Sequence, residues 1–148
     1  MFVHDFDFVE CPVHEVRQRL ISDPKKWLES AFKYADEVGD MVLLKLGLGG
    51  GIAKWIELKI GTPRMRGEVL VLPISWEATG PKNLFPKMQA ELEVASFGPD
   101  QTQLVFLGSY EAPLGGIGEK MDNALMHRVA EASIRKMISQ LAISFSNA

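Results

Sequence analysis

Residues 119–145 read EKMDNALMHRVAEASIRKMISQLAISF, and this stretch decides the fold. It contains neither proline nor glycine, whereas Pro113 and several glycines lie just before it. Its apolar residues recur at the three- and four-residue spacing of one helix face. They are Met121, Leu125, Val129, Ile134, Met137, Ile138, Leu141 and Phe145. The pattern predicts one long amphipathic helix.

The length of this helix sets the architecture. At about 1.5 Å per residue it would run roughly 40 Å. A compact domain of this chain length has a radius of gyration of about 15 Å, so the helix would cross the whole molecule. Its apolar stripe therefore needs a partner of similar length, and the middle of the chain is the candidate.

The composition is that of an ordinary globular chain, with 148 residues, 47% hydrophobic and 24% charged, and we expect a single domain over residues 1–148. A net charge of −3 gives no basic footprint for nucleic acid. Cys11 is the only cysteine, which excludes an intrachain disulfide and a thiolate metal site, so we expect no metal or cofactor. No apolar run approaches the roughly 18–20 residues of a membrane span, and the acidic N-terminus is unlike a signal peptide. These features predict a cytoplasmic protein and leave a homodimer open.

The N-terminal third predicts a strand followed by two short helices. Residues 2–9 alternate and place four aromatic rings on one parity. Pro12 suits the first turn of a helix over residues 13–22. Asp23 is a suitable N-cap for a second helix that ends near Tyr34.

From residue 39 to residue 111 the apolar period changes to two, which predicts strands. Pro73 lies inside one of them and predicts a bulge or an edge position. The glycines at 47 and 49–51 favour a hairpin turn over a phosphate loop, because no Lys-Ser/Thr pair follows them. Short turns join antiparallel strands, so we expect a curved antiparallel sheet around the long helix. The predicted strands cover residues 42–48, 55–60, 69–79, 88–94 and 102–110.

Four segments carry a family resemblance: ISWEATGP at 74–81, LFPKMQAELEV at 84–94, TQLVFLGSYEAPLGGIGEKMD at 102–122 and HRVAEASIRKMISQLA at 127–142. With the order of elements, they resemble bacterial polyketide cyclase/dehydratase-like members of the SRPBCC, or START-like, helix-grip superfamily. The resemblance implies an α+β fold with a seven-stranded antiparallel sheet. Six strands are evident, so one more is expected near residues 32–40 or near Gly67. It also implies an elongated apolar cavity between the sheet and the helix.

The alternation of the strands predicts which side chains would face this cavity. Each of them would serve equally well in an ordinary packed core. Gly108 stands out, because a glycine inside a strand indicates close approach by a neighbour, here the helix or a ligand. The candidates are Trp76, Met88, Ala90, Leu92, Leu104, Phe106, Gly108 and Tyr110 from the sheet, and Met121, Leu125 and Val129 from the helix.

Polar groups for chemistry are few. Tyr110 and Trp76 could each orient a ligand, although a hydrogen bond to the backbone explains either equally simply. His127 lies at the flank of the helix stripe, which favours a solvated or salt-bridged histidine over a general base. His4 shares the parity of the aromatic residues in the first strand and could face inward as a second base. No histidine pair has the spacing of metal ligands.

The remaining polar candidates have simpler interpretations. Ser109 and Ser133 lack a recognisable triad motif, and Cys11 at a chain bend is expected to be structural. Three glutamates are expected on the wet face of the sheet, namely Glu57, Glu77 and Glu91.

Three functions remain in view. The first is binding, or transport, of an apolar or amphipathic small molecule such as a lipid, a sterol or a polyketide-like compound. The alternative is an enzyme of the polyketide cyclase/dehydratase type that uses a cavity Tyr or His for proton transfer. The third is an interaction module with a filled core. A closed, packed interior would favour the third function. An open cavity with a paired titratable group would favour the enzyme, and an open cavity without one would favour the binder.

Overall fold

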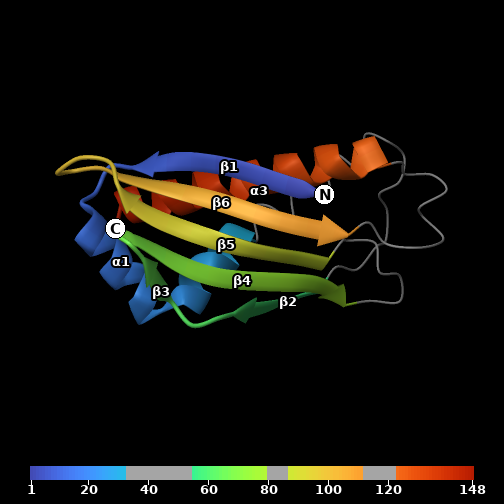
Figure 1. The fold of residues 1–148 in the computed structure, drawn as a ribbon, viewed down its shortest axis with the longest axis horizontal. Coiled ribbons are helices and arrows are strands. Elements are labelled where there is room, and N and C mark those ends of the chain that lie inside the picture. Colours follow the sequence, from blue (N-terminus) through green and yellow to red (C-terminus); the bar gives the residue numbers. More distant parts are fainter. Residues whose placement is uncertain (33–54, 80–86, 112–122) are drawn as a thin grey trace.

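The computed structural model describes residues 1–32, 55–79, 87–111 and 123–148. In this part of the chain, six strands form one antiparallel sheet, and the helices lie behind it (Figure 1). The elements are β1 (Phe2–Val9), α1 (Val13–Ser22), a helix over 24–32, β2 (Trp55–Ile60), β3 (Arg64–Arg66), β4 (Val69–Thr79), β5 (Lys87–Ser96), β6 (Thr102–Glu111) and α3 (Asn123–Ser146).

The strand order β1-β6-β5-β4-β2 places the first and last strands of the described chain side by side. Five predicted strands are confirmed. The additional strand was expected near residues 32–40 or near Gly67, and β3 lies at the second of these two places. β3 pairs with β4 through a turn at Gly67, whose φ of 63° favours glycine. The predicted strand over residues 42–48 and its glycine turn lie outside the described residues.

Pro73 does not lie at an edge, because β4 is a central strand with a regular register to β5. The alternative prediction, a bulge, is met on the other side, where the three residues 61–63 face the two residues 72–73. On this side, β4 pairs first with β3 and then with β2. Pro73 lies between these two partners, where its carbonyl accepts a hydrogen bond from Gly61 N at 2.8 Å. In an antiparallel strand the N and O of one residue point to the same side. The missing N–H of Pro73 therefore falls where the partner strand changes.

Helix α3 lies against β1 and β6 and confirms the long C-terminal helix, although the predicted start at Glu119 lies outside the described residues (Figure 1). Its stripe is buried from Ile134 to Phe145, both at most 2% exposed. Burying each large apolar side chain stabilises the fold by about 1.5–3 kcal/mol. Arg135 adds an ion pair to Asp5 of β1 at 3.4 Å.

The two short helices close one end of the molecule. Asp23 caps the helix over 24–32, because its Oδ1 accepts a hydrogen bond from Lys26 N at 3.2 Å. Trp27 of this helix stacks on Phe145 of α3 with ring centroids 4.6 Å apart. Among the helices described here, none is long and apolar enough to cross a membrane.

Candidate functional site

The inner face of the sheet, which faces α3, carries the side chains that the strand alternation predicted. Met88 is 3% exposed, Ala90 is 8% exposed, and four further members of the layer are at most 1% exposed. Trp76 differs, because it is only partly buried. The deeply buried members are Leu92, Leu104, Phe106 and Tyr110.

An aromatic cluster surrounds Trp76 at the margin of this layer. The Trp76 ring packs edge-on to Phe32 of the helix over 24–32, with centroids 4.5 Å apart. It also lies 5.9 Å from the ring of Phe106 on β6. Phe32 and Phe106 are buried, so the partly open surface of the cluster belongs to Trp76. The helix over 24–32, β4 and β6 thus each contribute one large aromatic side chain at the margin of the buried layer.

Gly108 makes room for the sheet's own side chains. A Cβ atom at this position would lie 2.6 Å from Phe106 Cε1 and 2.8 Å from Met88 Sδ. The close neighbours are therefore two inner-face side chains, whereas the sequence suggested the helix or a ligand. The absence of a side chain lets the Phe106 ring and the Met88 thioether lie over the strand.

A hydrogen-bonded chain of three side chains joins β6 to α3. The Tyr110 hydroxyl lies 2.8 Å from His127 Nδ1, and His127 Nε2 lies 2.6 Å from Glu131 Oε1. A carboxylate accepts only, so Nε2 carries a proton, and in the neutral ring Nδ1 accepts the Tyr110 proton. Burial, and then the negative charge of Glu131, raise the pKa of Tyr110. His127 was expected to be solvated or salt-bridged, and it contacts the carboxylate of Glu131 at the flank of the helix. Tyr110 bonds to the His127 side chain through its hydroxyl.

His4 is not brought to this face, and three further predicted site residues cannot be assigned to it. His4 is exposed on the outer face of β1, so its expected inward orientation is wrong, because Val3 and Val9 supply the buried parity of that strand. Met121 lies outside the described residues. Leu125 and Val129 lie on α3, but their side chains lie outside the described part.

The remaining candidates behave as structural or surface residues. Cys11 is buried, and its Sγ lies 3.0 Å from Glu15 Oε2. Ser109 is exposed on the outer face, and Ser133 is partly buried on α3. Glu91 lies on the wet face, as predicted, whereas the side chains of Glu57 and Glu77 lie outside the described part. No cluster of metal-binding side chains occurs among the described residues.

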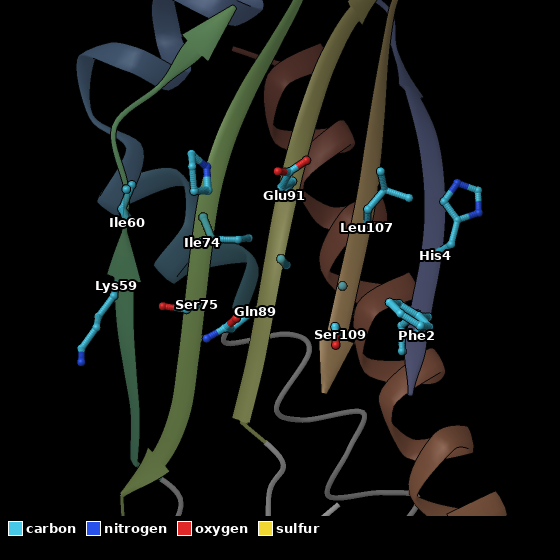
Figure 2. Close-up of a pocket in the computed structure, with 15 residues that line it drawn as sticks. Phe2, His4, Lys59, Ile60, Ile74, Ser75, Gln89, Glu91, Leu107 and Ser109 are labelled. Carbon is cyan, nitrogen blue, oxygen red and sulfur yellow. The ribbon is translucent and has the colours of Figure 1, made fainter. Parts of the chain in front are cut away.

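The outer face of the sheet carries a trough of about 640 Å³, which the sequence patterns did not predict. Its lining forms three adjacent rows that cross five strands (Figure 2). One row contains Lys59, Ser75, Gln89, Ser109 and Phe2, in order across the sheet. The only sequence signal for the trough was the polar or small residue at every second position of the strands. Any solvent-exposed sheet face shows the same pattern, so it does not indicate a trough.

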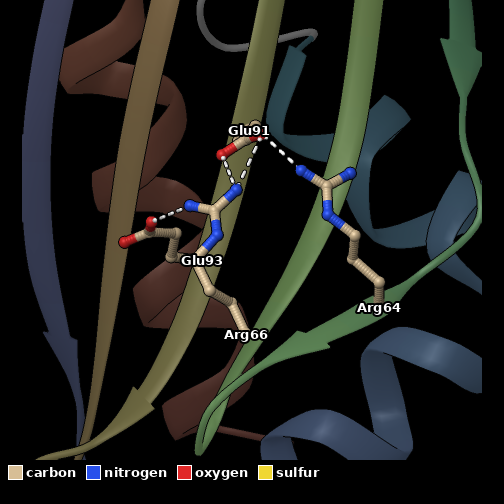
Figure 3. A network of polar contacts seen from close by, with 4 residues as sticks. All are labelled: Arg64, Arg66, Glu91 and Glu93. Carbon is tan, nitrogen blue, oxygen red and sulfur yellow. Dashed lines mark hydrogen bonds and ion pairs between the residues drawn. The ribbon is translucent and has the colours of Figure 1, made fainter.

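An ion-pair network borders the trough (Figure 3). Arg64 Nη2 lies 2.6 Å from Glu91 Oε1, and Arg66 Nη2 lies 3.1 Å from Glu91 Oε2. Arg66 also reaches Glu93 at 3.4 Å. Two cations and two carboxylates thus tie β3 across β4 to β5, and Glu91, which lines the trough, is already paired on both oxygens.

Comparison with known proteins places this architecture. No protein-family model and no curated protein sequence matches the chain. Among solved structures, the Zhui aromatase/cyclase from Streptomyces sp. R1128 has a TM-score of 0.54 at 10% identity, covering 99% of this chain and 94% of that chain. A conserved protein from Geobacillus kaustophilus has a TM-score of 0.57 at 15% identity, and the match covers 97% of this chain and 94% of that chain. Ara h 8.0201 gives 0.53 at 10% identity, with 100% and 99% covered.

These neighbours share the curved antiparallel sheet and the C-terminal helix packed against it. At such identities the likeness concerns the fold. This chain has a helix-grip fold.

Proposed function

We propose that this protein binds an apolar or amphipathic small molecule, of lipid, sterol or polyketide-like size, between the inner face of the sheet and α3. The observation that carries the proposal is the partly open Trp76 beside the buried Phe32 and Phe106. Large aromatic side chains line apolar ligand sites, and Trp adds an N–H that can orient a polar group.

The described side chains of the inner layer beyond Trp76 are buried, so a ligand would enter by moving some of them. Met88 is the most adaptable member, because it is unbranched and has three rotatable bonds. Its Sδ lies over Gly108, where the bare backbone leaves it free to change rotamer. We therefore propose that the ligand wedges between Trp76 and Met88.

The expected affinity follows from apolar burial. Covering about 500 Å² of apolar surface at roughly 25 cal/mol per Å² gives about 12 kcal/mol. Association costs at least about 4 kcal/mol, and opening the closed layer costs more. About 8 kcal/mol or less remains, which corresponds to micromolar or weaker binding.

A neutral apolar fluorescent probe, N-phenyl-1-naphthylamine, tests this proposal. Trp76→Ala should raise the dissociation constant of the probe by about fivefold or more, because a large aromatic contact is lost. Trp27→Ala is the matched control, since Trp27 stacks on Phe145 in a separate aromatic contact. Equal affinity of both variants and the unaltered protein would rule out a site at Trp76. Native mass spectrometry of protein purified without detergent would identify a co-purified ligand.

A second candidate function is proton transfer, which the alternative of a polyketide cyclase/dehydratase-type enzyme requires. The chain Tyr110–His127–Glu131 favours it, because both contacts are within hydrogen-bond reach and the carboxylate orients the imidazole. Tyr110 is only 1% exposed, so a substrate would have to displace its neighbours before reaching the hydroxyl. This buried position makes binding the first choice.

A further inference from the structure

We propose that the trough on the outer face of the sheet is a second binding site, and that it takes a planar aromatic anion. The site lies on the opposite side of the sheet from the inner face, because the side chains of its two outer rows point away from α3 (Figure 2). The middle row belongs to the buried face, and its Val3 and Ile74 lie in the core. The inference rests on the shape of the trough, on an aromatic group at one margin, on a polar floor and, at the other margin, on a lysine that has no ion-pair partner among the described residues.

The shape suits a small molecule. The trough crosses five strands, and four gaps of about 4.8 Å give a width of roughly 19 Å. Its volume of about 640 Å³ lies within the range of roughly 300–1,000 Å³ of small-molecule sites. Ala90 and Gly108 lie at its centre, and neither places a large side chain in it. An elongated, flat ligand would fill this space.

The margin over β1 and β6 is apolar and open. Phe2 is 81% exposed and Leu107 is 40% exposed, although both are large apolar side chains. Figure 2 shows the Phe2 ring beside Ser109, at the edge of the trough. A planar ring lying on Phe2 would remove apolar surface from water and gain aromatic stacking. This margin therefore selects the aromatic part of the ligand.

The floor offers unused hydrogen-bonding groups. Ser75, Gln89 and Ser109 lie on three adjacent strands in one row. In the part of the chain that the structure describes, none of these three side chains hydrogen-bonds to another side chain. Hydroxyl and amide groups both donate and accept, so they suit polar substituents along the body of a ligand.

The charge balance selects an anion. Glu91 and Glu93 are matched by Arg64 and Arg66 at the border of the trough. Lys59 lies at the margin over β2 and forms no ion pair with a carboxylate of the described chain (Figure 2). Among the described residues of the trough and its border, its ammonium group is thus the charge without an ion-pair partner, and it lies opposite the aromatic margin. A ligand that satisfies both margins carries its ring system at one end and an anionic group at the other.

Two fluorescent probes separate this site from the inner one. The anionic probe 6-(p-toluidino)-2-naphthalenesulfonate is elongated and carries its sulfonate at the end opposite the toluidino ring, whereas N-phenyl-1-naphthylamine has related rings and no charge. Lys59→Ala and Phe2→Ser should each raise the dissociation constant of the sulfonate probe by about three- to tenfold. Neither change should alter the neutral probe, which Trp76→Ala affects if the proposed inner site exists. Raising the salt concentration should weaken binding of the sulfonate probe to the unaltered protein but not to Lys59→Ala.

Two control variants complete the experiment. Phe97→Ser removes another exposed phenylalanine, 55% exposed, and Lys25→Ala removes another exposed lysine, and neither residue lines the trough. Both controls should bind the sulfonate probe with unchanged affinity. The proposal is overturned if Lys59→Ala and Phe2→Ser bind it as the unaltered protein does, or if the controls weaken it equally. It is also overturned if Trp76→Ala abolishes binding of both probes, because the inner face would then hold them both.

Discussion

Replacing Gly108 with alanine should destabilise the protein by about 1–2 kcal/mol. The added Cβ would lie 2.6 Å from Phe106 Cε1 and 2.8 Å from Met88 Sδ, so both side chains must move. Overpacking a core costs about 1–3 kcal/mol, whereas replacing a strand glycine gains roughly 0.5–1 kcal/mol from the unfolded chain. Met88 can change rotamer, but the fully buried Phe106 ring has little room, so the cost exceeds the gain.

Urea unfolding followed by circular dichroism measures this difference. A loss of this size lowers the melting temperature by about 2–8 °C for a chain of this length. Ser109→Ala is the control at the adjacent exposed position and should stay within about 0.5 kcal/mol. In a double-mutant cycle, Phe106→Leu should offset part of the cost of Gly108→Ala, with a coupling of at least about 0.5 kcal/mol. Equal or higher stability of Gly108→Ala would refute the close-packing argument.

Two further predictions concern buried polar groups. Tyr110→Phe should lower the free energy of unfolding by about 0.5–1.5 kcal/mol, because it removes the hydrogen bond to His127 Nδ1; an unchanged urea midpoint would contradict that contact. Burial, and then the hydrogen bond to Glu15, raise the pKa of Cys11 above its ordinary value of 9.0. The folded protein therefore favours the neutral thiol, and the stabilisation from this preference is fully present below pH 9.0 and is lost as the pH rises through the folded-state pKa. The urea midpoint should therefore fall less between pH 8 and pH 10 for Cys11→Ala than for the unaltered protein, and parallel curves would sink this prediction (both pH values about one unit from the ordinary value).

The strands and helices were accessible from the sequence because their signals are local. The alternation around Leu92 and Phe106 assigned both residues to the buried face, and the structure confirms this. Pro73 shows the limit of such reasoning, because a proline rule assumes that each side of a strand has one partner. In β4 the partner changes from β3 to β2 beside Pro73, and only the pairing of distant segments reveals it.

The functional groups were harder to place, because their meaning depends on neighbours far away in the chain. His4 shares a parity with three phenylalanines, which suggested an inward face, but Val3 and Val9 occupy the interior. Tyr110 and His127 were each noted separately, yet no spacing rule joins a strand residue to a helix residue.

The sequence by itself determined the long amphipathic helix, the antiparallel strands and the buried parity of β4, β5 and β6, because hydrophobic periodicity is a property of each segment alone. Only the tertiary structure decided which strands adjoin, that Gly108 accommodates Phe106 and Met88, and that five strands align polar residues into an outer trough. Register and strand order set these contacts, and they depend on the packing of the whole sheet against its helices.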